Sequence, residues 1–152
     1  MIPELADNVL PEGIHDCDMD EVTKCFGQFA RSDRRIRLTA KLRQFVEEAR
    51  KSGICVAVVI DGSYVTGKDE PEDIDMVLAL KPDVDESREL TPFEYSIRSK
   101  RLVKQNYGFD LFAAKEGTDR YNALIDFFCQ VRPDDPAQAT NRSHKGLLRV
   151  KL

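Results

Sequence analysis

Several residue types and segments that mark particular protein classes are scarce or missing here. The chain has 152 residues, only two histidines (His15 and His144), and four cysteines without a Cys-x-x-Cys pair. It has no run of about eighteen apolar residues, the length that a transmembrane helix needs. Its amino terminus is not the basic-then-apolar segment of a signal peptide. We therefore expect a soluble cytoplasmic protein with no membrane partner, whose cysteines are reduced and structural.

The charge balance limits the partners of the chain. Acidic residues outnumber basic ones by 27 to 23, which gives a formal net charge of -4. This balance argues against strong general binding of nucleic acid, which requires many Lys and Arg contacts to phosphates. A local basic patch remains open, because Arg98, Lys100, Arg101 and Lys104 share one predicted helix. The alternative is an ordinary solvated helix surface.

Apolar spacing and turn signals divide the chain into helices and strands. Residues 34–52 repeat their apolar positions at helical spacing, with Ser32 as a candidate cap and Gly53 after the end. Residues 54–60 (ICVAVVI) are apolar throughout, which is typical of a strand covered on both faces. The predicted helices span about 19–25, 34–52, 92–106 and 119–130, and the predicted strands span 54–60, 74–80, 108–114 and 146–152.

This order of elements predicts the α/β (or α+β) class, with a small mixed β-sheet flanked by helices. The length is that of one domain, residues 1–152, which can bury a single core. Within it we expect an amino-terminal wrap over residues 1–31, a motif-bearing core over 32–114, and a carboxy-terminal helix and strand over 115–152.

Three aspartates stand where apolar residues would be expected. The two-residue period of a strand places Asp73 and Asp75 on one face of the strand 74–80, and Asp110 interrupts the apolar strand 108–114. Buried carboxylates are costly unless cations or metal ions accompany them. If the two strands are neighbours, the three carboxylates converge. The alternatives are solvent-facing acids on an edge strand, or acids paired with nearby Arg and Lys.

A cluster of oxygen ligands favours Mg²⁺ or Mn²⁺ over zinc, and Mg²⁺ in proteins commonly accompanies nucleotide phosphates. The Gly62-Ser63 turn before these acids offers backbone N–H groups and a hydroxyl to such phosphates. On its own this turn would be ordinary; the spacing to Asp73 makes it a candidate phosphate site.

The combined pattern closely resembles the polymerase-β-like nucleotidyltransferase superfamily over residues 34–114. Three further stretches, LPEGIHDCDMDEV, DGSYVTGKDEPEDID and KGLLRVKL, are similar to small, uncharacterised bacterial nucleotidyltransferase-like proteins of toxin-antitoxin or defence type. The residues that carry the superfamily pattern are Gly62, Ser63, Gly67, Asp73, Asp75 and Asp110.

The resemblance implies a nucleotidyltransferase-like fold and a division of roles. Asp73 and Asp75 would hold two Mg²⁺ ions on an NTP, and Asp110 would hold the ion nearer the acceptor. Gly62 and Ser63 would grip the β- and γ-phosphates. The acceptor hydroxyl, on a protein or RNA, would attack the α-phosphorus in line, with pyrophosphate leaving.

The chain departs from the pattern in the loop after the turn. Many relatives in the small antitoxin-like branch carry Arg before the glycine at position 67, where this chain has Thr66, and the loop beyond is acidic. Lys68 is the candidate replacement cation; the alternative is a solvated loop lysine. The missing cation points to weaker nucleotide binding, a different donor, or a site that has lost its chemistry.

Three functions follow from these residues. The leading prediction is a Mg²⁺-dependent nucleotidyltransferase that acts on a protein or RNA, with a cognate toxin or antitoxin as partner. The second is a catalytically inactive binding or antitoxin module on the same fold. A metal-dependent phosphoesterase is the third, and the scarcity of histidine disfavours it.

Overall fold

The computed structural model describes residues 1–28, 33–132 and 140–152. Its strands are β1 (Ile14–Cys17), β2 (Cys55–Asp61), β3 (Asp75–Leu80), β4 (Asp110–Lys115) and β5 (Leu147–Lys151). Its α-helices are α1 (Met19–Phe26), α2 (Arg34–Ser52), α3 (Pro92–Arg98), α4 (Lys100–Tyr107) and α5 (Asp119–Phe128), and Ser63–Val65 forms a 3-10 turn.

The five strands form one mixed sheet in the order β1-β5-β2-β3-β4. Strand β2 pairs antiparallel with both β3 and β5, whereas β1 with β5 and β3 with β4 are parallel pairs. The predicted class, α/β with a small mixed sheet and flanking helices, is confirmed.

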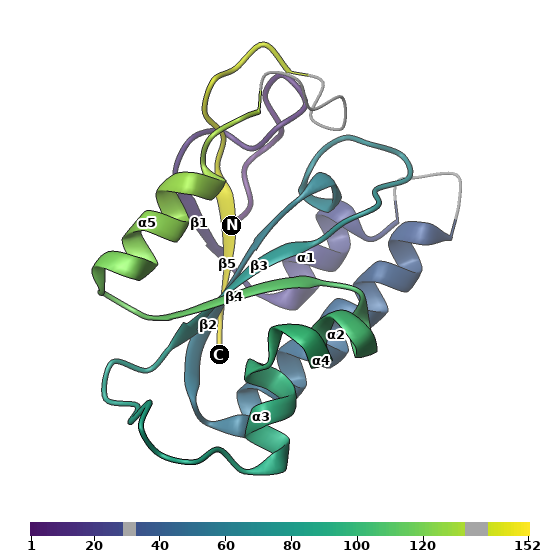
Figure 1. Ribbon diagram of the computed structural model, residues 1–152. Coiled ribbons are helices and arrows are strands. Elements are labelled where there is room, and N and C mark those ends of the chain that lie inside the picture. Colours follow the sequence, from purple (N-terminus) through teal and green to yellow (C-terminus); the bar gives the residue numbers. More distant parts are fainter. Residues whose placement is uncertain (29–32, 133–139) are drawn as a thin grey trace.

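The helices form two layers around this sheet (Figure 1). Helices α1 to α4 cover one face, where Val58 and Ile60 of β2 are buried with the inner side of α2. Helix α5 covers the other face, where Val59 and Ala57 pack with its residues. The alternation along β2 explains why its sequence is apolar throughout, since both sides of the strand are buried. Within the described ranges, no helix combines the length and apolar character that a bilayer span requires.

Two parts of the chain differ from the sequence-based expectation. Strand β1 extends the sheet within the segment where only a helix was predicted; its four residues are too few for a clear pattern. The predicted helix 92–106 is two helices, because Ser99 has an extended ψ of 117° and its hydroxyl caps α4 by accepting a bond from the Leu102 N–H. Ser32, the predicted cap of α2, lies outside the described residues.

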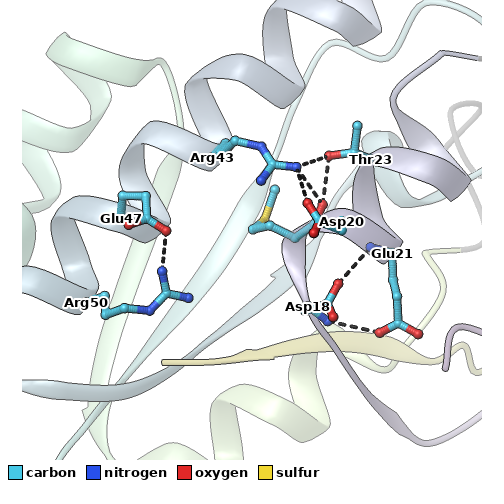
Figure 2. A network of polar contacts seen from close by, with 8 residues as sticks. Asp18, Asp20, Glu21, Thr23, Arg43, Glu47 and Arg50 are labelled. Carbon is cyan, nitrogen blue, oxygen red and sulfur yellow. Dashed lines mark hydrogen bonds and ion pairs between the residues drawn. The ribbon is translucent and has the colours of Figure 1, made fainter.

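Polar contacts hold helix α1 against α2 (Figure 2). Asp18 and Glu21 form a capping box at the start of α1, each accepting a backbone N–H of the other. Arg43 of α2 donates to the Thr23 hydroxyl at 2.8 Å and pairs with Asp20 at 3.0 Å. These bonds set the position of the amino-terminal helix on the core.

A buried arginine joins α2 to the loop that follows β2. The Arg35 guanidinium is fully buried and donates to the carbonyl oxygens of Tyr64 and Thr66 at 2.8 Å and of Phe26 at 3.0 Å. Its Nε also donates to the Lys68 carbonyl at 3.1 Å. Burial lowers the pKa of Arg35 to about 10, so the side chain keeps its charge at neutral pH. One side chain therefore satisfies several loop carbonyls at once.

We expect Arg35→Met to lower the free energy of unfolding by at least about 3 kcal/mol, because each buried carbonyl left without a donor costs about 1–3 kcal/mol. Urea denaturation of the two proteins measures the difference. The matched control is Arg37→Met, two residues further along the same helix, whose side chain is 67% exposed and should contribute less than about 1 kcal/mol. Equal effects of the two substitutions would contradict this role of Arg35.

Candidate functional site

Three aspartates lie side by side at one end of the sheet. The strand register pairs Asp61 of β2 with Asp75 of β3, and Asp75 with Asp110 of β4. Residues paired across neighbouring strands share a face of the sheet, at a Cα separation of about 5 Å. Here that face is the one covered by α5, since Val59 and Val77, two residues further along their strands, pack with that helix. We name Asp61, Asp75 and Asp110 the acid row.

Asp75, at the centre of the row, has no direct partner. Among the described residues, its carboxylate accepts no hydrogen bond and forms no ion pair. Burial, followed by the negative charges of Asp73, Asp61 and Asp110, raises its pKa to about 7, and the charge of Lys145 opposes that rise only in part. A carboxylate in such surroundings favours the arrival of a cation.

Asp61 has a partner that the sequence did not reveal. Its Oδ1 lies 2.9 Å from the Nζ of Lys145, and these side chains are only 7% and 4% exposed. Burial raises the pKa of Asp61, and the Lys145 ammonium opposes that rise. Lys145 reaches Asp61 because β5, which begins just after it, pairs antiparallel with β2. The sequence places Lys145 with Arg142 and His144 in a late polar loop that could reach a nucleotide's phosphates or form a plain surface loop, but it does not pair Lys145 with Asp61.

The Gly62-Ser63 turn binds an acid of its own chain. The Ser63 N–H donates to the Asp73 Oδ1 at 2.9 Å, and the Ser63 hydroxyl donates to the same oxygen. Gly62 has a φ of 95°, and a Cβ added there would lie 2.8 Å from the Asp73 carbonyl, so the turn requires glycine. Asp73 was predicted to lie beside Asp75 on the strand, but β3 begins only at Asp75. Asp73 therefore precedes the strand and closes the turn.

Asp110 is the last member of the row and lies on β4. The prediction that the strands bearing Asp75 and Asp110 are neighbours is confirmed. Its Oδ1 lies 3.2 Å from the Nζ of Lys104 in α4, and the two side chains are 39% and 58% exposed. An ion pair this exposed contributes little to stability and separates easily. Lys104 thus belongs to the predicted basic face, but it contacts an acid of this chain.

A small polar cavity of about 50 Å³ lies beside the turn. It is lined by residues of the acid row and the turn, Asp61, Gly62, Ser63, Asp73 and Asp75. Residues from the end of α5 and from the segment between α5 and β5 also line it, among them Phe127, Gln130, Arg132 and Lys145. This volume accommodates an ion with a few waters, but a nucleotide base would have to lie outside it.

Two predicted nucleotide-binding residues are not among those that line this cavity. The Gly67 N–H donates to the Asn8 carbonyl at 3.3 Å, and a Cβ at this glycine would collide with the Asn8 side chain. The carbonyl of Lys68 accepts from Arg35. Thr66 is buried and donates to the Ser63 carbonyl, so it shapes the loop from inside. The loop after the turn thus brings no cation to the cavity.

Oxygen ligands of this kind suit Mg²⁺ or Mn²⁺. Within the described residues, no three Asp, Glu, His or Cys side chains form a ready ligand group. The reason is visible in the contacts, since Asp73 binds Ser63, Asp61 binds Lys145 and Asp110 binds Lys104. Asp75, which has no direct partner among the described residues, fits a cation. Asp73 and Asp110 contact their present partners through Oδ1, so each has a second carboxylate oxygen that could complete the ligand set.

Comparison with known proteins assigns the chain to a family. It belongs to a family of unknown function, DUF6932, whose model matches residues 3–151. A search of the curated proteins and a search of the solved structures found no match.

We expect Asp75→Asn to stabilise the protein at alkaline pH when divalent metal is removed by EDTA. The native pKa of about 7 lies above the usual 3.8, so the folded chain binds this proton more firmly than the unfolded chain. The wild-type free energy of unfolding therefore falls as the pH rises between these values. The advantage of the variant over the wild type should grow by up to about 4 kcal/mol between pH 4 and pH 8.

Urea denaturation at several pH values measures this difference, with Asp69→Asn in the exposed loop as control. A constant difference between Asp75→Asn and wild type across this range would show that Asp75 has an ordinary pKa.

Proposed function

We propose that this DUF6932 protein is a Mg²⁺-dependent nucleotidyltransferase that moves a nucleoside monophosphate from an NTP to a protein or RNA hydroxyl. The observation that carries the proposal is the position of Asp75, which has no direct partner among the described residues and lies between Asp61 and Asp110 and beside the Gly62-Ser63 turn. An acid row next to a phosphate-sized turn is what nucleotidyl transfer with bound metal requires.

The resemblance to polymerase-β-like enzymes supports the same reading. Three features support it: the Gly62-Ser63 turn follows β2, Asp75 is the first residue of β3, and Asp110 is the first residue of the parallel neighbour β4. We propose that the α/β sheet of this protein is a version of that fold.

Each residue has a distinct task in this reaction. Asp75 and Asp73 would hold metal ions, and Asp110 would be a further metal ligand. Bound ions would offset the charge that develops on the attacking and leaving oxygens. Both Ser63 donors bind the Oδ1 of Asp73, so its Oδ2 could ligate a metal while they remain bound. Release of Oδ1 would make the Ser63 N–H and hydroxyl available to a phosphate. Asp110 likewise contacts Lys104 through Oδ1, and the exposure of this pair makes its release inexpensive.

The acceptor is proposed to come with a partner molecule. The cavity of about 50 Å³ cannot enclose a base or an acceptor side chain. A cognate toxin or antitoxin that covers the site would supply the missing wall and the hydroxyl. We assign this partner because of the resemblance to small toxin-antitoxin and defence proteins. A fold by itself does not identify a partner.

One observation favours a second candidate, the inactive binding or antitoxin module. Lys145 already compensates Asp61, Lys104 pairs with Asp110, and Ser63 binds Asp73. Three of the four acids thus have partners without any metal, as a protein that retains only the fold would require.

Label transfer separates the two candidates. The protein is incubated with each α-labelled NTP, Mg²⁺ or Mn²⁺, and lysate, and the thermal shift on adding each metal is recorded in parallel. We expect transfer and a metal-dependent rise in Tm for the wild type, and loss of both for Asp75→Ala and Asp73→Ala. Removing a ligand of the catalytic metal should lower the rate by at least about a hundredfold.

The control is Glu72→Gln, an exposed acid next to Asp73 that changes the charge of the loop by the same amount. It should transfer label at the wild-type rate. A metal-dependent Tm shift without transfer of any nucleotide would favour the binding module, and the absence of both signals would exclude the metal site.

A further inference from the structure

The cations beside the cavity come from a part of the chain that the motif does not include. Lys145 and Arg132 line it from the segment between α5 and β5. The loop after the turn contributes none. Thr66 is uncharged and bonded inside the loop, and Lys68 does not line the cavity. The donors of Ser63 are directed to Asp73. An anion that enters this cavity therefore meets positive charge from the carboxy-terminal side.

The backbone around Lys145 is held firmly in place. Its N–H donates to the Cys129 carbonyl at 2.8 Å, and the next residue, Gly146, donates to the Leu10 carbonyl at 2.9 Å. A Cβ at Gly146 would collide with the Pro11 carbonyl, so the chain passes here in close contact with the amino-terminal segment. This anchoring fixes where the Lys145 side chain enters the sheet end.

The ammonium of Lys145 is both buried and paired. It is 4% exposed and lies 2.9 Å from the Asp61 Oδ1. An ammonium carries three donors, more than its one ion-pair partner, the Asp61 carboxylate, can use. Asp61 is thereby suited to hold Lys145 in one position, while Lys145 shares the cavity with Ser63 and Asp73.

We propose that Lys145, positioned by Asp61, binds the polyphosphate group of the nucleotide. This inference rests on the proposed function for the identity of the ligand, a nucleoside triphosphate. The lysine binds an oxygen of the phosphates within the cavity that it lines together with the Gly62-Ser63 turn. Arg132, which is exposed at the rim, adds a second and weaker contact.

Binding of inorganic tripolyphosphate tests this role without requiring turnover. Isothermal titration calorimetry in a fixed excess of Mg²⁺ compares the wild type with Lys145→Met and with the double variant Asp61→Asn/Lys145→Met. The double variant removes both buried charges, so neither is left unpaired if the single variant folds poorly. We expect at least about tenfold weaker binding in both, the loss of one charge-assisted hydrogen bond.

The matched control is Lys41→Met, which removes an exposed lysine of α2. Because this lysine does not line the cavity, its loss should change the affinity less than about twofold. Wild-type affinity in a folded double variant, an equal loss in Lys41→Met, or no binding to the wild type would overturn the inference.

The result is independent of the outcome for nucleotidyl transfer. Lys145-dependent binding of tripolyphosphate without transfer of any nucleotide supports this inference and counts against the enzyme. Transfer by the double variant with an unchanged KM for the NTP supports the enzyme and overturns the role of Lys145.

Discussion

The guanidinium of Arg35 connects the helical layer to the end of the sheet that bears the site. Its bonds to the carbonyls of Tyr64, Thr66 and Lys68 hold the loop after β2 in one conformation. That loop starts with the turn whose Ser63 binds Asp73. The buried arginine thus fixes the loop that carries the turn without lining the cavity itself. Its burial is tolerable because its N–H groups are hydrogen-bonded to several carbonyls.

The site itself is organised by negative charge in a confined space. The sheet register brings Asp61, Asp75 and Asp110 next to one another, and like charges at this spacing repel. Two of the three acquire a lysine, Lys145 in the interior and Lys104 at the surface. Asp75 acquires none among the described residues, and its raised pKa expresses the remaining imbalance. A metal ion would remove that imbalance, which links the electrostatics of the fold to the proposed chemistry.

Local sequence patterns predicted most helices and strands, and they predicted the cavity-lining residues Gly62, Ser63, Asp73 and Asp75. The apolar run of β2 and the helical spacing of α2 predicted those elements closely, because burial on the sheet or on one helix face selects residue types at a fixed period. The sequence patterns did not predict the helix break at Ser99 or the strand β1. One ψ angle and a strand of four residues are too short to produce a recognisable period in the sequence. Lys68 was a plausible cation by proximity in sequence, yet it is Lys145 that lines the cavity.

The sequence by itself determined the class of the fold, the Gly62-Ser63 turn and the presence of acids at the ends of two strands, because these depend on neighbouring residues along the chain. Only the tertiary structure decided which charges meet. Lys145 and Asp61 are far apart in the sequence and become partners through the antiparallel pairing of β5 with β2. Asp73 turned out to close the turn because its position just before β3 places its carboxylate at the Ser63 N–H. Strand pairing is a long-range property, so the partner of each acid could not be inferred from its local sequence.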